Sequence, residues 1–209
     1  MTQSTTTTTT RDAHDPRKPD ILLWIDVETT ALDPDDGQLL EVGMLATDTN
    51  GEPIHHLRTW LIGHDAIDMT PTTSYAIGLH ARNGLIEQTF KYGQYERQVA
   101  RDIDRMLTAL ADGRTLHPAG TNVDFDLRWL CLKLDLKLEQ LDYHRLDMSS
   151  LRILMGQACL GAYAHATTDH RVASCIDRDL TEYKAILEAF APLTAGSRHD
   201  GEGKGERCR

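Results

Sequence analysis

The sequence predicts a single α/β domain in which helices flank a mixed β-sheet. Two observations support this fold class: three strand-like segments open the folded part of the chain, and helical and strand-like segments then alternate. The chain has 209 residues, of which 40% are hydrophobic, enough for one well-filled core. Residues 1–19, with an unbroken run of threonines, and the glycine-rich residues 193–209 are too polar to join that core. We therefore expect a folded domain at residues 20–192 between two disordered ends.

The expected elements follow from the spacing of apolar residues. Alternating or short apolar segments predict five strands, at residues 21–27, 38–48, 53–62, 115–119 and 143–147. The Asn50-Gly51 turn makes the second and third strands an antiparallel hairpin. Apolar residues at helical spacing predict short helical pieces near 72–88 and longer helices at 95–110, 124–134 and 171–191.

Composition limits the classes of function. The net charge of −10 disfavours a protein that grips long DNA or RNA through many phosphate contacts, so a nucleic-acid substrate would be short. No stretch approaches the roughly 20 consecutive apolar residues of a membrane helix. The four cysteines form no CxxC pair. These features together predict a soluble protein of the reducing cytoplasm.

Two carboxylates follow the first apolar run of the chain, Ile21 to Ile25. Because side chains alternate along a strand, Asp26 and Glu28 can point to the same face while Val27 packs behind them. Such a triplet also arises by chance in so acidic a chain, so its spacing alone is weak evidence. Its place at the end of a buried strand favours a site for a hard cation, because buried acids without compensation are unfavourable.

A third carboxylate and a histidine come later in the chain. Asp126 lies near the start of an expected helix, where the positive helix end stabilises a negative charge. We expect Asp124 to be the N-cap, which leaves Asp126 free to point at the first two acids. His170 opens the last helix, and composition alone leaves a surface role and a chemical role equally open.

These stretches together resemble the DEDD family of 3′–5′ exonucleases in its histidine-containing branch (DEDDh), and within it most closely the oligoribonucleases. The segment WIDVETTALDP, residues 24–34, resembles the first family motif, and NVDFDLRWL, residues 122–130, resembles the second. His170-Arg171 resembles the opening of the third. The resemblance covers nearly all of residues 20–190 and implies a ribonuclease H-like mixed sheet flanked by helices.

The resemblance also implies a chemistry. Asp26, Glu28 and Asp126 would bind two divalent ions, Mg²⁺ or Mn²⁺, which clamp the scissile phosphate. His170 would take the proton from the attacking water, because its near-neutral pKa suits a general base. The implied reaction is the hydrolysis of short single-stranded RNA, dinucleotides above all, to mononucleotides.

Further family positions are implied to contact the substrate. Leu32 resembles a wedge between the last two bases, and Tyr75 falls where the family places a stacking ring. In oligoribonucleases a partner subunit completes a pocket that caps the 5′ phosphate, so a homodimer is implied. In that cap His144 stands in place of an arginine, and an imidazole cannot donate the two parallel hydrogen bonds with which a guanidinium binds a phosphate. The complete implied substrate-binding set is Leu32, Tyr75, His80, Asn122, Tyr143, His144 and Ser149.

One position departs from the family pattern. A fourth acid follows the histidine by five residues in this branch, and Cys175 stands there in this chain. Asp177 faces away on a helix, while Asp179 shares the face of Cys175 about 6 Å further along, so neither replaces the missing acid. A thiolate is a soft ligand that suits Mn²⁺ or Zn²⁺ better than Mg²⁺. The second metal site is therefore the doubtful one.

Several interpretations follow from this departure. The first interpretation is a weakened or metal-shifted exonuclease, because three acids and the histidine remain. The others are an inactive homologue that binds short oligonucleotides, and an ordinary enzyme into which one substitution was introduced. An alternative with a different substrate is a proofreading-type exonuclease, which acts on the ends of single-stranded DNA. A binding module without metal is disfavoured, because three clustered acids would repel one another.

Overall fold

The structure is a computed structural model that describes residues 18–157 and 169–195. Its centre is a five-stranded sheet in the order β3-β2-β1-β4-β5. β1 pairs antiparallel with β2 and parallel with β4, so the sheet is mixed, as predicted. The strand bounds are Asp20–Thr29 (β1), Leu39–Thr47 (β2), Arg58–Leu61 (β3), Thr115–Gly120 (β4) and Leu146–Asp147 (β5).

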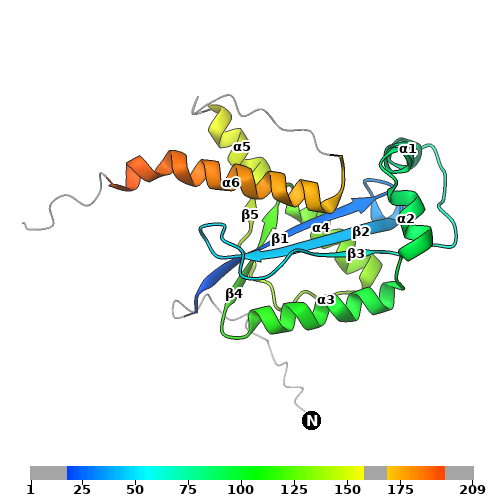
Figure 1. Cartoon of the computed structure of the whole chain (residues 1–209), viewed down its shortest axis with the longest axis horizontal. Helices are drawn as coiled ribbons and strands as arrows, with labels where there is room; N and C mark the ends of the chain where they lie inside the picture. The colour runs from blue at the N-terminus through cyan, green and yellow to red at the C-terminus, as the bar shows by residue number, and fades with distance from the viewer. Residues whose placement is uncertain (1–17, 158–168, 196–209) are drawn as a thin grey trace, which may run out of the picture.

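Helices cover both faces of this sheet (Figure 1). α6 lies across one face and α3 across the other, while α1 and α2 pack at the end toward which β1 points. The helix bounds are Ser74–Arg82 (α1), Leu85–Tyr92 (α2), Glu96–Ala111 (α3), Val123–Leu134 (α4), Met148–Gln157 (α5) and Val172–Ala195 (α6), with a short 3-10 turn at Pro34–Asp36 (η1).

The alternation of side chains along β1 divides the core into two layers. Ile21, Leu23 and Ile25 pack with α3 and α4, whose buried faces include Ile103 and Trp129. The residues between them on the opposite face of β1 pack with α5 and α6. By the same alternation, the side chains of Asp26 and Glu28 point to this opposite face, which α6 covers.

A glycine lets α6 approach the sheet closely. Gly43 of β2 pairs with Asp26 of β1. A Cβ added at Gly43 would lie 2.7 Å from the Cβ of Val172. This contact is too short, so either the strand backbone or α6 would have to move. The pairing of β1 and β2 also changes register between Glu28 and Thr29. This irregularity bends the end of the strand beside the two carboxylates.

The element predictions were largely right, with five differences. Residues 53–57 lie outside the third strand and residues 143–145 lie outside the fifth, so both strands are shorter than expected. Helix α5 was not predicted, and α6 continues four residues beyond its expected end. The prediction of Asp124 as N-cap was wrong: α4 begins at Val123, Asn122 is the N-cap in a left-handed conformation without a side-chain cap, and Asp124 lies in the first turn, where it pairs with Arg145.

Some expectations concern the ends of the chain. Residues 1–17 and 196–209, which hold most of the predicted disordered ends, lie outside the described residues. Within the described part, no helix combines the length and the apolar character needed to cross a membrane.

Candidate active site

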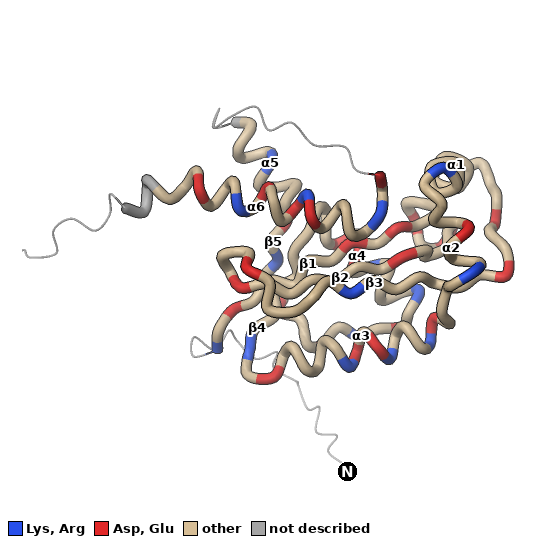
Figure 2. The backbone as a smooth tube through the Cα atoms, viewed as in Figure 1, with Lys and Arg blue, Asp and Glu red and all other residues tan. Residues whose placement is uncertain are grey.

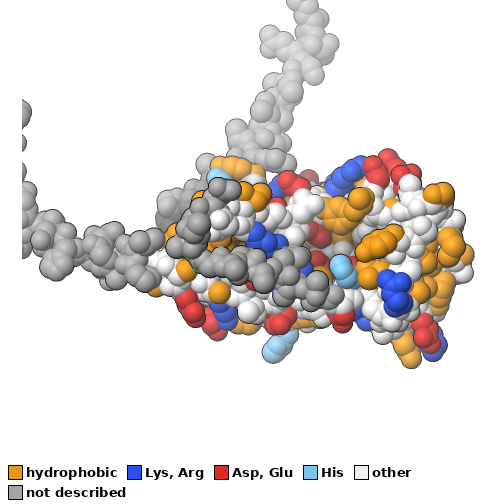
Figure 3. Space-filling view, turned by 90° about the horizontal axis from the view of Figure 1, so that it is seen from above, with side chains coloured by type: hydrophobic (Ala, Val, Ile, Leu, Met, Phe, Trp, Pro, Cys, Tyr) orange, Lys and Arg blue, Asp and Glu red, His pale blue; other side chains and the backbone are white. Residues whose placement is uncertain are grey.

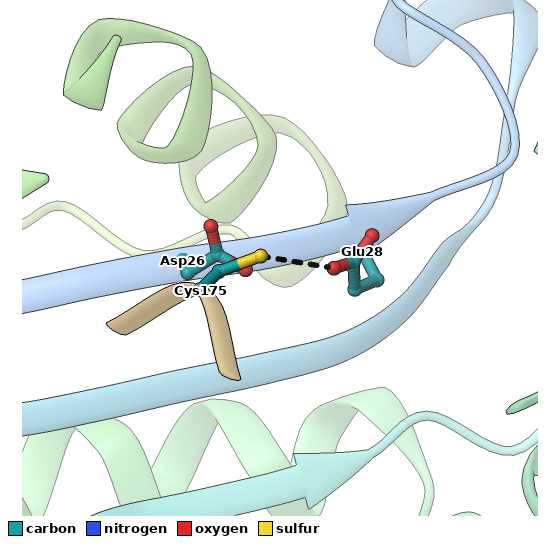
Figure 4. A group of neighbouring side chains, drawn as sticks. All are labelled: Asp26, Glu28 and Cys175. Carbon is teal, nitrogen blue, oxygen red and sulfur yellow. Dashed lines mark hydrogen bonds between the residues drawn. The ribbon is translucent and has the colours of Figure 1, made fainter. Parts of the chain in front are cut away.

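Three side chains from two elements meet at the end of β1 (Figure 4). Asp26 and Glu28 come from the strand, and Cys175 comes from the first turns of α6. One potential ligand atom of each lies within 4.8 Å of the others. The Cys175 thiol is directed at Oε1 of Glu28, 3.8 Å away. The spacing of the two acids along β1 and the close approach of α6 together build this group.

Asp126 joins the group from α4. Its carboxylate is 3% exposed, and its Oδ1 accepts a hydrogen bond of 2.9 Å from the backbone N–H of Val27. Since Val27 stands between Asp26 and Glu28, this bond brings the start of α4 directly beside both acids. The structure thus brings together the three carboxylates and the cysteine that the sequence singled out.

Burial makes these carboxyl groups hard to ionise without a counter-charge. Burial raises the pKa of Asp26 well above its ordinary value, and the neighbouring Asp126 raises it further. Burial and repulsion from Glu41 raise the pKa of Glu28 to about 8. Burial also raises the pKa of Asp126, although the hydrogen bond from Val27 opposes the shift. Burial is the largest cause of all three shifts, and Arg178 near Asp26 and Arg171 near Glu28 oppose them only in part.

The group fits a divalent cation. Oδ2 of Asp26 is buried and has no hydrogen-bond partner among the described residues. An orphaned carboxylate oxygen beside a second acid and a thiol is the donor set that a cation would complete. The carboxylates suit Mg²⁺ or Mn²⁺, whereas the thiol favours softer ions.

His170 lies at the edge of this group and is exposed, immediately before α6. It has a positive φ of 54°, which is unusual for a residue with a side chain. The side-chain amide of Asn83 donates hydrogen bonds to the carbonyls of Asp169 (2.8 Å) and His170 (3.0 Å). These two bonds attach the turn before α6 to the turn between α1 and α2.

The next residue anchors the start of α6 to the sheet. Arg171 binds Glu41 of β2 through two hydrogen bonds, Nε to Oε2 at 2.9 Å and Nη2 to Oε1 at 2.8 Å. It also donates to Gln88 of α2 at 3.0 Å. The bidentate pair with a carboxylate that is itself buried fixes the direction in which α6 leaves the turn.

His80 differs from the other predicted substrate contacts because it is buried, with 2% of its surface exposed. Its Nε2 lies 3.2 Å from the carbonyl of Thr29 and 3.6 Å from Oε2 of Glu28. Burial lowers the pKa of His80 to about 4, so the ring is neutral at physiological pH. In this conformation His80 is a neighbour of Glu28, and a substrate contact would require the ring to become exposed.

The remaining predicted substrate residues are more open. Leu32 is 85% exposed and Tyr75 is 80% exposed, and Asn122 is also exposed at the start of α4. Figure 3 shows hydrophobic side chains gathered at the end of the molecule that carries α1 and α2. Tyr143 and His144 are exposed and packed together, with ring centroids 3.8 Å apart. Ser149 is half-buried in the first turn of α5 and donates its N–H to Asp147.

A buried ionic cluster beside the site was missed by sequence reasoning. Asp179 accepts hydrogen bonds from Thr121, from Arg152 at 2.8 Å and from Arg178 at 2.8 and 2.9 Å. Arg152 also binds Glu182. Both oxygens of Asp179 are engaged within this cluster, and its negative charge raises the pKa of Asp26 and Asp126. Only the helical spacing of Cys175, Arg178 and Asp179 could have indicated this arrangement.

Comparisons with known proteins agree with the motif resemblance. No protein-family model matches the chain. A Schizosaccharomyces pombe protein named "Probable oligoribonuclease" is 27% identical over 167 residues, which cover 77% of this chain and 65% of the relative. An oligoribonuclease of Baumannia cicadellinicola is 28% identical over 133 residues, which cover 64% of this chain and 72% of the relative.

Solved structures show the same fold. Exonuclease I of Methylocaldum szegediense aligns with a TM-score of 0.61 at 17% identity, over 84% of this chain and 43% of that one. E. coli exonuclease I in complex with a dT13 oligonucleotide aligns with a TM-score of 0.62 at 14% identity, over 85% of this chain and 44% of that one. The chain thus spans less than half of these larger proteins. The chain is therefore similar in sequence to proteins named oligoribonuclease and similar in fold to exonuclease I.

Proposed function

We propose that this protein is a divalent-cation-dependent 3′–5′ exonuclease that hydrolyses short oligoribonucleotides, dinucleotides especially, to mononucleotides. The observation that carries the proposal is the close grouping of Asp26 and Glu28 at the end of β1, with Asp126 bound to the backbone N–H of Val27 between them. Three acids with raised pKa values in one place point to a bound cation rather than to packing.

Asp26, Glu28 and Asp126 would hold the cation, with Mg²⁺ and Mn²⁺ as the candidates and two ions as the expected number. A bound divalent cation supplies positive charge for the scissile phosphate and lowers the pKa of water. Cys175 weakens the site for Mg²⁺, because a thiol is a poor ligand for a hard ion. We therefore expect reduced activity that Mn²⁺ supports better than Mg²⁺.

The protein's own groups account for the proton transfer. His170 is exposed, so a water molecule at the site can reach its ring, and its imidazole would accept the proton of the attacking water. Asn83 and the Arg171–Glu41 pair hold the backbone on either side of this residue. A base held in this way loses little freedom in the transition state.

Exposed apolar groups at the α1–α2 end would bind the bases. Leu32 and Tyr75 offer a wedge and a stacking ring that solvent reaches freely.

We also propose that Tyr143, His144 and Ser149 contact the 5′ phosphate with the help of a second subunit in a homodimer. Light scattering after size-exclusion chromatography would test the dimer, and a monomeric mass would contradict it.

The second candidate is an inactive homologue that binds short oligonucleotides without turnover. The single observation that favours it is Cys175 at the position of the fourth acid, where it contacts Glu28 through the thiol. Binding of the dinucleotide without any release of mononucleotide, in either metal, would support this candidate.

The deciding experiment compares the protein with its Cys175→Asp variant. Each is incubated with a 5′-phosphorylated RNA dinucleotide in Mg²⁺ and in Mn²⁺, and release of mononucleotide is followed. We expect slow turnover of the unaltered chain in Mn²⁺ and faster turnover of the variant in both metals. Cys131→Asp, which adds the same charge at an exposed cysteine of α4, is the matched control and should change nothing.

Outcomes separate the candidates. If only Cys175→Asp turns over, the unaltered chain is the inactive homologue. If a single-stranded DNA with a free 3′ end is degraded faster than the RNA dinucleotide, the proofreading-type alternative replaces the proposed substrate. If the variant folds and binds metal but degrades neither, the exonuclease proposal fails.

A further inference from the structure

Most cationic side chains of the described residues are neutralised by a nearby acid. Examples on the surface are Lys91 with Glu87, Arg128 with Asp33 and Lys184 with Glu52. Among the described residues, five arginines have no carboxylate partner: Arg82 on α1, and a group of four, Arg58, Arg97, Arg101 and Arg114. All four are exposed and lie on α3 or close to it.

These arginines line two neighbouring depressions. One, of about 570 Å³, lies between Ile54, His55 and Arg58 on one side and Arg105, Leu110 and Arg114 on the other. The second, of about 580 Å³, follows the first half of α3 past Tyr95, Arg97 and Arg101. Asp102 and Arg105 line both, so the two depressions are adjacent along α3. We call the two together the arginine groove, lined by Arg58, Arg97, Arg101, Arg105 and Arg114.

The charge of the arginine groove is opposite to that of the whole chain. Asp102 is the acid that lines it, and Asp102 pairs with Arg105. The remaining guanidinium groups stay uncompensated in a protein of net charge −10. Solvated single arginines are common on protein surfaces, but several unpaired ones along one groove lower the energy of an anionic ligand there.

The row on α3 suits a chain of phosphates. Arg97, Arg101 and Arg105 follow one another at intervals of four residues, so they share one face of the helix at about 5 to 6 Å spacing. Tyr95, which is 84% exposed, stands at one end of the row. Regularly spaced cations next to an exposed aromatic ring are the features with which proteins bind single-stranded nucleic acid.

The arginine groove is distant from the candidate active site. α3 packs on the face of the sheet that holds Ile21, Leu23 and Ile25, whereas Asp26 and Glu28 belong to the face covered by α6. Figure 2 shows basic positions along α3 on the opposite side of the sheet from α6. A dinucleotide bound at the acids cannot reach the groove, whereas a longer strand can bind it independently.

We propose that the arginine groove is a second, non-catalytic binding site for the phosphate backbone of single-stranded nucleic acid. It would hold a strand that is longer than the substrate of the acidic site. Because the overall charge is negative, binding is modest and depends strongly on salt. This proposal concerns binding alone and does not require the protein to be an active exonuclease.

The test uses the full chain in EDTA, so that no hydrolysis occurs, and a 5′-fluorescein RNA dodecamer followed by fluorescence anisotropy. The variant is the triple change Arg97→Gln, Arg101→Gln and Arg114→Gln. We expect the affinity to fall by about tenfold or more at low salt. The plot of log affinity against log salt should become shallower by about 2, the value for three lost contacts to a single strand.

The matched control removes unpaired cations elsewhere, through Lys18→Gln, Arg82→Gln and Lys133→Gln. A loss of affinity equal to that of the groove variant would assign the effect to net charge and overturn the proposal. So would unchanged binding by the groove variant, or displacement of the RNA by poly-glutamate as efficiently as by unlabelled RNA. Hydrolysis of a dinucleotide is measured separately: its absence in all variants would contradict the proposed function and leave the groove's result intact.

Discussion

The side-chain amide of Asn83 donates a hydrogen bond of 3.0 Å to the backbone carbonyl of His170. The orientation of the amide follows from its other contact, because Oδ1 of Asn83 accepts the N–H of Leu85 at 3.0 Å. The nitrogen must therefore face the turn before α6. Since His170 has a positive φ, this contact stabilises a backbone conformation that the residue alone would disfavour.

Replacing Asn83 should impair the proposed general base without touching it. In Asn83→Ala the turn loses both hydrogen bonds, and we expect kcat for dinucleotide hydrolysis to fall between about tenfold and a hundredfold, as for a misplaced catalytic group. KM should change little. In the pH–rate profile, the limb that reports the general base should shift. Asn50→Ala removes an exposed amide in a distant turn and serves as control. Equal kinetics for the two variants would rule out a positioning role.

The pKa of Glu28 predicts how stability depends on pH in the absence of metal. Its folded value of about 8 lies above its ordinary value, so the folded state holds a proton that the unfolded chain has lost between about pH 4.5 and 8. The stabilisation is complete below this window and is lost as the pH rises through about 8. We expect the Tm of the metal-free protein to fall from pH 5 to pH 8.

Two measurements check this expectation. Glu28→Gln cannot ionise, so the slope of Tm against pH should be smaller in this variant. A divalent cation favours the ionised carboxylates, so Mn²⁺ should raise the Tm of the unaltered protein more at pH 8 than at pH 5. A Mn²⁺ effect that is equal at both values would contradict metal binding at Glu28.

The ionic cluster around Asp179 predicts a large effect on stability. In Asp179→Asn, the largely buried Arg178 loses its carboxylate partner, whereas Arg152 keeps Glu182. Leaving one buried charge without its partner costs up to about 3 to 5 kcal/mol, which urea unfolding would detect. Asp177→Asn, two residues away but exposed, should change the free energy of unfolding by less than about 0.5 kcal/mol.

Local patterns were sufficient to predict most of the fold and the acids of the site. The alternation along β1 correctly placed Asp26 and Glu28 on one face, whereas Cys175 was singled out by the motif resemblance. Helix α5 was missed although Met148, Leu151 and Met155 recur at helical spacing, because two further apolar side chains, Ile153 and Leu154, are exposed and obscure that pattern.

Contacts between distant segments could not be predicted in the same way. Asn83 and His170 are 87 residues apart, and their bond depends on how α1 and α2 pack at the end of the sheet. The same is true of Arg171 and Glu41, which are separated by 130 residues. The N-cap of α4 was mispredicted because both Asn122 and Asp124 are residue types that favour this position, and the helix begins after the first of them.

Leu32 and Tyr75 give the last prediction, which separates base binding from chemistry. Both side chains are almost fully exposed, so Leu32→Ala and Tyr75→Ala should leave Tm unchanged. Stacking of a base on an aromatic ring contributes about 1 to 3 kcal/mol, so Tyr75→Ala should raise KM for the dinucleotide about fivefold or more. Because neither residue contacts the acids, kcat should stay within about twofold. Ile153→Ala, at an equally exposed position on α5, is the control, and a KM effect as large there would show that the loss is not specific to the α1–α2 end.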